Sequence, residues 1–272
     1  MRLDKDYLVE LELWPHFEMR QRTAEASNIK PAPVPSQPNR PDLVPSVEID
    51  DAVIDRSSPV GKPAQSAVAD VGLIDPVRSA RINALAWSEL GADAGTCNAC
   101  ALCQQRQQVV FGVGPTSSPW MFVGEAPGAE EDQSGEPFVG QSGQLLDAML
   151  QAAGLLRGRD VYITNAVKCR PPGNRAPTVE EVAACAPYLD RQIDLVAPKI
   201  IVALGKAAIN RLTGLNTVMA ELRGQVYQYR GIPVVATYHP SYLLHKLAEK
   251  RKSWEDLVLA KNTLDRTHEV GK

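Results

Sequence analysis

Four of the five cysteines in this chain are spaced as two pairs that could share one metal centre. Cys97 and Cys100 form a C-x-x-C pair, whereas Cys169 and Cys185 lie far downstream, on either side of the run R-P-P-G-N-R at 170–175. Thiolate sulfurs bind zinc or iron–sulfur clusters, and four of them are enough for either. The long loop within the second pair is unusual for a structural zinc site, but the spacing alone leaves both metals open.

Four short motifs carry further side chains that could do chemistry. They are V-G-E-A-P-G-A-E-E-D at 123–132, P-F-V-G at 137–140, T-N-A-V-K-C at 164–169 and T-Y-H-P-S-Y-L-L at 237–244. They supply an aromatic ring (Phe138), an amide (Asn165), an imidazole (His239) and several carboxylates. Taken singly, each also has a structural explanation: a core phenylalanine, an asparagine that caps a turn, a structural histidine.

The elements that must position these motifs follow from the apolar pattern. Short apolar runs, mostly rich in β-branched residues, predict buried strands at 120–123, 161–163, 200–204 and 234–237. Helical patterns lie between them at 143–153, 178–196 and 206–212, with Thr178 as N-cap of the second and Glu181 as its capping-box partner.

This alternation predicts the α/β class, as a three-layer sandwich with a central, mostly parallel four-stranded sheet flanked by helices. Ligands of such sheets bind beyond the carboxyl ends of the strands. Three of the motifs, those that begin at Val123, Thr164 and Thr237, lie at such an end, so we expect their loops to converge on one edge.

The N-terminal part of the chain has a different composition. Residues 8–17 alternate apolar and polar side chains up to a proline, and nine of the chain's 21 prolines fall between residues 28 and 76. We interpret 1–76 as an N-terminal motif followed by a proline-rich, disordered linker, and 77–272 as the folded domain. A passive tether is the simpler interpretation, and the alternative is a tether that delivers the motif to an unidentified protein partner.

Composition and charge narrow the classes of protein. No apolar run approaches the roughly 18 residues of a membrane span, and no apolar stretch follows the N-terminus, so we expect a soluble, cytoplasmic protein. Five unevenly spaced cysteines argue against a disulfide framework. The formal net charge is −3, so a nucleic-acid binder would have to gather its basic residues on one face. The candidates for that face are Lys168, Arg170, Arg175, His245, Lys246 and residues 250–252.

In their order along residues 85–259, the cysteine segments C-N-A-C, K-C-R-P-P-G-N-R and A-C-A-P-Y-L and the four motifs resemble the family 4 uracil-DNA glycosylases, the iron–sulfur branch of the uracil glycosylase superfamily. The resemblance implies an enzyme of base excision repair that flips uracil out of DNA and hydrolyses its N-glycosidic bond, leaving an abasic site. We expect it to act on uracil-containing DNA as a monomer. The resemblance also implies that Cys97, Cys100, Cys169 and Cys185 hold a 4Fe-4S cluster, with Cys103 as a spare thiol.

The same resemblance assigns roles around the base. Phe138 would stack on uracil, Asn165 would pair with its amide edge, and His239 would donate a hydrogen bond to the leaving base. Gly124 and Ala126 belong to a tight turn whose backbone comes close to the base.

The partner of the attacking water stays open. Some members of the superfamily have an aspartate at the position of Ala126, and alanine cannot replace it. Glu131 and Glu125 are the candidate catalytic carboxylates, with Glu131 ranked slightly ahead. The structural alternative for Glu131 is an acidic residue at a helix N-terminus.

The resemblance further implies a DNA-binding surface. The segment that begins at His239 would reach into the minor groove, with Ser241 and Tyr242 as DNA contacts, while Arg170 and Arg175 would contact phosphates. The structural alternative is that the apolar part of this segment begins a final helix and packs on the sheet.

Rival interpretations remain within and outside the superfamily. A branch that traps DNA through a histidine on an inserted basic loop is disfavoured, because no histidine follows Cys169 nearby. A zinc hydrolase is disfavoured because the four histidines are scattered and no H-E-x-x-H occurs. The alternative that stays open is a non-catalytic nucleic-acid-binding or polymerase-associated protein with a structural metal cluster.

Overall fold

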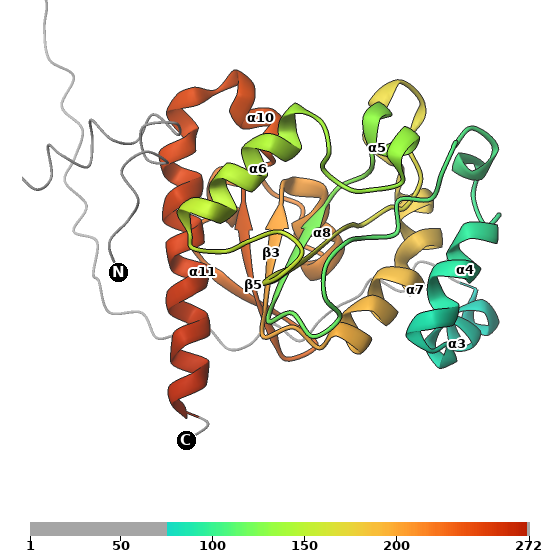
Figure 1. Ribbon diagram of the computed structural model, residues 1–272, viewed down its shortest axis with the longest axis horizontal. Helices are drawn as coiled ribbons and strands as arrows, with labels where there is room; N and C mark the ends of the chain where they lie inside the picture. Colours follow the sequence, from blue (N-terminus) through green and yellow to red (C-terminus); the bar gives the residue numbers. More distant parts are fainter. Residues whose placement is uncertain (1–74, 271–272) are drawn as a thin grey trace, which may run out of the picture. The chain divides into compact units, whose positions relative to one another are not determined.

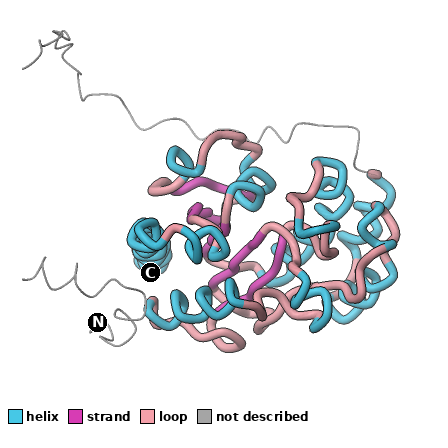
Figure 2. The backbone as a smooth tube through the Cα atoms, turned by 90° about the horizontal axis from the view of Figure 1, so that it is seen from above, coloured by secondary structure: helices cyan, strands magenta, loops and turns pink. Residues whose placement is uncertain are grey.

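The computed structural model describes residues 75–270, and side chains as far as residue 267. The expected N-terminal motif and linker, apart from residues 75 and 76, lie outside the described part. Within it, five strands form one sheet in the order β2-β1-β3-β5-β4. Figures 1 and 2 show strands at the centre of the domain with helices around them. Their bounds are β1 Trp120–Gly124, β2 Val161–Asn165, β3 Ile200–Leu204, β4 Val226–Tyr229 and β5 Ile232–Thr237.

The four predicted strands are present and run parallel to one another. All residues of β1, β2 and β3 are buried, as expected for largely apolar strands covered on both faces. The expectation of four strands was one short, because β4 pairs antiparallel with β5 at the edge of the sheet. The turn between them contains Arg230 and Gly231, both with positive φ, which is the geometry of a tight hairpin.

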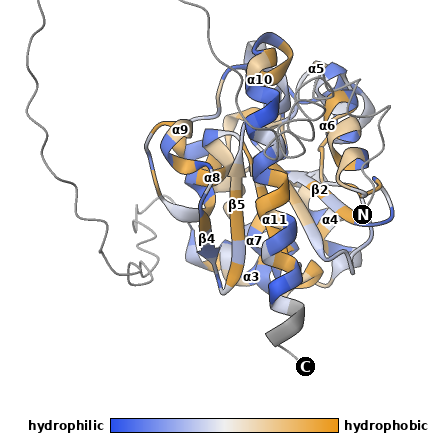
Figure 3. Cartoon of the chain, turned by 90° about the vertical axis from the view of Figure 1, so that its left-hand side faces the viewer, coloured by the Kyte–Doolittle hydropathy of each residue, from blue (hydrophilic) through white to orange (hydrophobic). Residues whose placement is uncertain are grey.

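Helices cover both faces of this sheet (Figure 1). The core on one face joins alternate strand residues to α7 (Val179–Val196) and α8 (Lys206–Thr213). The buried side chains of α6 (Gln141–Ala152) and α11 (Lys250–Val270) do not belong to that core, and α11 packs on β5 and β3 from the opposite face. In Figure 3 β5 is largely hydrophobic along its length, whereas α11 carries both hydrophobic and hydrophilic residues. The described part is therefore the predicted three-layer sandwich.

The predicted capping box at the start of α7 is confirmed. The Glu181 backbone N–H donates to Thr178 Oγ1 at 3.3 Å, and the Thr178 N–H donates to Glu181 Oε2 at 2.8 Å. Two such reciprocal bonds satisfy backbone donors that the first turn leaves unpaired. They fix where α7 begins, and therefore where Cys185 lies two turns later.

Smaller elements complete the domain at two places. Before the sheet, α3 (Pro76–Ala84) and α4 (Trp87–Thr96) pack on α7. Beyond the carboxyl ends of the strands lie α5 (Ala129–Ser134) and α10 (Pro240–His245), towards which the arrowheads of β3 and β5 point in Figure 1. A short helix α9 (Met219–Leu222) precedes β4. Among residues 75–270 no helix is both long and apolar enough to cross a membrane.

Candidate active site and metal centre

The loops that follow β1, β2 and β5 enclose an open cavity of about 400 Å³. This size is in the range of small-ligand sites. Eight of the residues predicted for the site line it; seven come from the four motifs, and Arg175 comes from the 170–175 loop. They are Glu125, Ala126, Glu131, Phe138, Asn165, Arg175, His239 and Ser241. The expected convergence of the motif loops on one edge of the sheet is thus observed.

Gly124 leaves the space between two of these side chains. It is the last residue of β1 and is in register with Asn165 of β2. A Cβ at this position would overlap Asn165 Oδ1 and lie 2.6 Å from Phe138 Cζ. Only glycine therefore allows the amide and the ring to approach each other over the end of β1.

Asn165 presents an acceptor without a partner. Its side chain is 1% exposed, and Oδ1 makes no hydrogen bond within the described part of the chain. Its backbone is held firmly, because the carbonyl accepts a hydrogen bond from Lys168 Nζ at 2.7 Å. Leaving a buried acceptor unpaired is unfavourable, and a ligand N–H would remove that penalty.

His239 is held as a neutral imidazole. The Ser241 backbone N–H donates to its Nδ1 at 3.2 Å, and Ser241 Oγ lies 2.7 Å from the same atom. Burial lowers the pKa of His239 to about 4, although Glu131 acts in the opposite direction. With Nδ1 accepting from the backbone, the proton lies on Nε2, so the ring has one N–H donor to offer a ligand.

The rings of His239 and Phe138 lie side by side, with centroids 5.5 Å apart and planes inclined by 32°. Phe138 is almost fully buried and has φ = 56°. This left-handed conformation is uncommon for any residue other than glycine. The position of the ring therefore depends on contacts that hold the backbone at Phe138.

The two candidate carboxylates have different surroundings. Glu131 Oε1 accepts from the backbone N–H groups of Val139 (3.0 Å) and Gly140 (3.2 Å), and Oε2 accepts from Gly128 (3.0 Å). Both oxygens are thus engaged in joining the loop before α5 to the loop after Phe138. Glu125 has no side-chain hydrogen bond or ion pair within residues 75–270, and burial raises its pKa. These contacts favour Glu125 over Glu131 as the carboxylate free to meet water, the reverse of the predicted ranking.

The predicted DNA-binding residues are only partly brought together. Arg175 forms a two-pronged ion pair with Glu181, with N–O distances of 2.8 and 2.6 Å. Arg170 lies outside the cavity lining and donates to Asn174 Oδ1 at 2.7 Å. Tyr242 is 42% exposed and stacks on Tyr238, with ring centroids 5.0 Å apart.

The apolar segment after His239 forms α10. Leu243 is fully buried, whereas Leu244 lines the cavity. Part of this segment therefore packs inward, as the structural alternative expected, and Tyr242 and Leu244 remain at the surface of the site.

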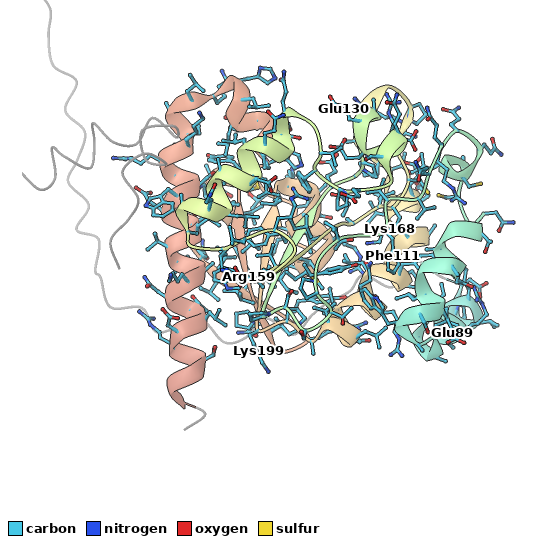
Figure 4. All side chains as sticks on the ribbon, in the orientation of Figure 1. Glu89, Phe111, Glu130, Arg159, Lys168 and Lys199 are labelled. Atoms are coloured by element: carbon cyan, nitrogen blue, oxygen red, sulfur yellow. The ribbon has the colours of Figure 1, made fainter. Side chains whose placement is uncertain are left out.

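Lys168 does not belong to a DNA-binding surface. Its side chain is 2% exposed, and Nζ donates to Thr164 Oγ1, the Asn165 carbonyl and Gln192 Oε1 at 2.6 to 2.7 Å (Lys168 is labelled in Figure 4). The Lys168 side chain points inward, back towards the end of β2, where Thr164 and Asn165 accept its hydrogen bonds. It braces the backbone of Asn165 instead of facing solvent.

All five cysteines line one small cavity between α4, α7 and the segment after β2. Cys169 and Cys185 are buried, and the others are half-buried. Burial raises the pKa of Cys185 to about 12 and also raises those of Cys100 and Cys169. Buried thiols of this kind keep their protons unless a metal replaces them.

Three nitrogen donors already point at these sulfurs. Arg106 Nη1 lies 3.2 Å from Cys169 Sγ, and the Lys168 backbone N–H lies 3.3 Å from Cys185 Sγ. Arg78 Nη2 lies 3.4 Å from Cys97 Sγ. Donors of this type stabilise thiolates and tune metal–sulfur centres. Sequence reasoning missed Arg78 and Arg106, since neither lies in a motif.

Comparison with known proteins agrees with this geometry. The family model of the uracil DNA glycosylase superfamily matches residues 111–258. The type-4 uracil-DNA glycosylase of Thermotoga maritima is 45% identical over 170 residues, which cover 61% of this chain and 88% of that protein. The type-4 enzyme of Pyrobaculum aerophilum is 46% identical over 60% of this chain and 87% of its own length. A type-5 uracil-DNA glycosylase of Pyrobaculum aerophilum is 39% identical over 45% of this chain and 61% of its own length. This chain belongs to the uracil-DNA glycosylase superfamily, and within it to the type-4 enzymes.

Proposed function

We propose that this protein excises uracil from DNA, hydrolysing the N-glycosidic bond between the base and deoxyribose. The observation that carries the proposal is the unpaired, buried Oδ1 of Asn165 in a cavity that also contains the Phe138 and His239 rings. A flipped base needs a stacking surface, an edge to pair with and a donor at the oxygen where charge collects. These three residues supply one of each.

Asn165 discriminates between bases through its donor and acceptor pattern. Uracil offers an N3–H donor beside an O4 acceptor, which match the carbonyl oxygen and the NH₂ group of one asparagine amide. Cytosine offers an unprotonated N3 beside an amine, so it would leave Asn165 Oδ1 unpaired and oppose two donors. A buried polar group that loses its partner in this way rejects the wrong ligand strongly.

His239 stabilises the leaving group. As the bond between N1 and C1′ breaks, the electron pair moves onto the base, and negative charge spreads to its carbonyl oxygens. A neutral imidazole with its proton on Nε2 donates a hydrogen bond to such an oxygen without having to lose a charge first. The low pKa of His239 keeps the ring in this form at neutral pH.

Glu125 faces the sugar side of the reaction. Departure of the uracil anion leaves a cationic sugar, to which water adds at C1′ while its proton passes to a base or to solvent. We assign to Glu125 the carboxylate that stabilises this cation or orients the water, because it lines the cavity and has no side-chain partner among the described residues. Glu131 remains the second candidate, acting through the loops that it joins.

Cys97, Cys100, Cys169 and Cys185 fit a 4Fe-4S cluster, which we propose as the cofactor. Within residues 75–270 no three cysteine, histidine or acidic side chains are close enough to hold a single metal ion, yet the cysteines line one cavity. Four thiolates are enough for such a cluster, and these four lie in the segments that resemble the ligand segments of the iron–sulfur family. When bound, the cluster supplies a covalent cross-link between segments, since glycosidic hydrolysis transfers no electrons.

On the DNA side we propose Arg170, Ser241 and Tyr242 as contacts, all three at the exposed rim around α10 and the 170–175 loop. Arg175 supports that loop through its ion pair with Glu181. The cavity is complete within one chain, so a monomer suffices. The reducing cytoplasm is the compartment in which we expect such free thiols to persist.

Oligonucleotides with uracil, cytosine or thymine at one fixed position test the proposal. The full chain should release uracil alone, seen as a strand break after alkaline treatment of the abasic site. Binding of uracil-containing DNA with no excision would contradict it and would favour the non-catalytic alternative.

A further inference from the structure

Arg157, in the turn between α6 and β2, donates three side-chain hydrogen bonds, two of them to the segment that carries Phe138. Its Nη1 donates to the Pro137 carbonyl at 3.0 Å, and its Nη2 donates to the Phe138 carbonyl at 2.9 Å. Its Nε donates to Asp147 Oδ1 at 2.7 Å, from α6. The guanidinium thus holds two successive carbonyls, one of which belongs to the residue that faces the base.

The backbone at Phe138 needs this support. Phe138 has the left-handed conformation, and its carbonyl oxygen lies against Gly143 of α6. There the carbonyl packs so tightly on Gly143 that a Cβ at 143 would overlap it. Gly143 provides the space for this carbonyl, and Arg157 provides hydrogen bonds that stabilise the uncommon backbone conformation.

The planar shape of arginine suits this task better than its charge does. A guanidinium offers five N–H donors in a fixed fork, whereas a lysine amine on a flexible chain cannot reach two carbonyls and a carboxylate in fixed directions. Asp147 completes the arrangement, because it orients the fork and balances its charge. Neither Arg157 nor Asp147 lines the cavity.

We propose that Arg157 is a positioning residue that holds the Phe138 ring where it stacks on the base, and that it acts on the reaction only through Phe138. The inference rests on the proposed function, since a stacking role for Phe138 has meaning only if a base enters the cavity. It concerns a residue that belongs to none of the four sequence motifs.

A double-mutant cycle separates this role from a general effect on folding. The variants are Arg157→Lys, Phe138→Leu and the double variant, all in the full chain, with single-turnover excision of uracil from a DNA oligonucleotide as the readout. Arg157→Lys should slow excision by roughly tenfold to a hundredfold, the size of effect that a misplaced binding group produces. In the Phe138→Leu background, Arg157→Lys should alter the rate by less than about twofold, because the ring that Arg157 positions is then absent.

Arg159→Gln is the matched control. Arg159, labelled in Figure 4, lies two residues further along the same turn, and its side-chain hydrogen bonds go to Asp160. This variant should excise uracil at the wild-type rate. Thermal melting of all variants measures folding separately. Should Arg157→Lys fold poorly, Asp147→Asn provides a milder change, with a smaller loss that also disappears in the Phe138→Leu background.

Equal slowing by Arg157→Lys in both backgrounds would overturn the inference, as would wild-type excision by Arg157→Lys and Asp147→Asn. If the wild-type chain itself released no uracil, the proposed function would have failed, which is a different result from either of these.

Discussion

At the scale of single residues, the site depends on side chains whose position, tautomer or free hydrogen-bonding capacity is set by contacts with neighbouring residues. Lys168 holds the backbone of Asn165 through its carbonyl, and the buried Oδ1 of Asn165 has no hydrogen-bond partner within the described residues. His239 is held by Ser241 in one tautomer. Glu131 has both oxygens occupied, whereas Glu125 does not. The type of residue alone would not separate these roles; the hydrogen bonds do.

The protonation of His239 gives a prediction about pH. Burial lowers its pKa from 6.5 to about 4, so the imidazole should stay neutral from pH 8 down to about pH 5. Because the unfolded chain binds this proton more tightly, the contribution of His239 to the free energy of unfolding is complete above pH 6.5 and falls as the pH drops from 6.5 to about 4. NMR titration of the His239 ring protons should give a midpoint well below 5.5. A midpoint near 6.5 would contradict the neutral-donor role.

At the scale of elements, α7 joins the cysteine cavity, our proposed metal centre, to the active site. Its first turn carries Glu181, which holds Arg175 of the loop that lines the cavity, and its next turn carries Cys185. The same loop begins at Cys169, so both of its ends are tied to the cysteine cavity. A cluster bound by these cysteines would therefore fix the position of the 170–175 loop relative to the base site.

Replacement of single cysteines tests this connection. Alanine at any of the four proposed ligands (Cys97, Cys100, Cys169, Cys185) should remove iron and sulfide together and lower the melting temperature, because the cross-link is lost. Cys103→Ala is the control and should keep both. Iron and sulfide assays with the visible absorbance spectrum provide the measurement. Stoichiometric zinc without sulfide in the wild-type protein, or loss of the cluster on replacing Cys103, would show that the ligand set is wrong.

At the scale of the whole molecule, the sequence predicted those parts of the fold that local pattern determines. The parallel strands were predictable because short apolar runs, mostly rich in β-branched residues, are typical of buried strands. The start of α7 was predictable because Thr178 and Glu181 have the spacing of a capping box. The fifth strand was missed because Val226–Tyr229 is a short, half-exposed edge strand without a continuous apolar run. Whether a strand lies at the edge of a sheet depends on how the whole sheet is assembled, so a local sequence pattern does not predict it.

The candidate site shows the same division. The motif residues were found because their types and spacing are those of a known family. Lys168 was wrongly assigned to the surface, because the sequence around a lysine does not show whether its side chain is buried. In the structure this side chain points inward and donates to Thr164 and Gln192. Arg157 was missed because its role comes from a contact across 19 residues, in a turn with no distinctive pattern.

The N-terminal residues give a prediction at this scale. Every residue of the cavity and of the cysteine centre lies within 75–270, so deletion of residues 1–74 should leave uracil excision at the full-length rate. Asp75 must be kept, since its carboxylate accepts hydrogen bonds from the backbone of Val77 and Arg78 at the start of α3. Deletion of one more residue should therefore lower the melting temperature slightly. A truncated chain that folds but no longer excises uracil would show that the tail contributes to the site.

The central claim is that His239 and Asn165 together perform base-specific excision, and single-turnover kinetics on uracil-containing DNA test it most directly. His239→Ala should slow the chemical step by roughly 100-fold or more, as the loss of an oxyanion donor commonly does, while DNA binding changes little. Asn165→Asp should weaken uracil excision, since a carboxylate cannot donate to O4, and it could admit cytosine. If His239→Ala kept the wild-type rate of chemistry and only bound DNA more weakly, the histidine would be a DNA contact and the proposed mechanism would be wrong.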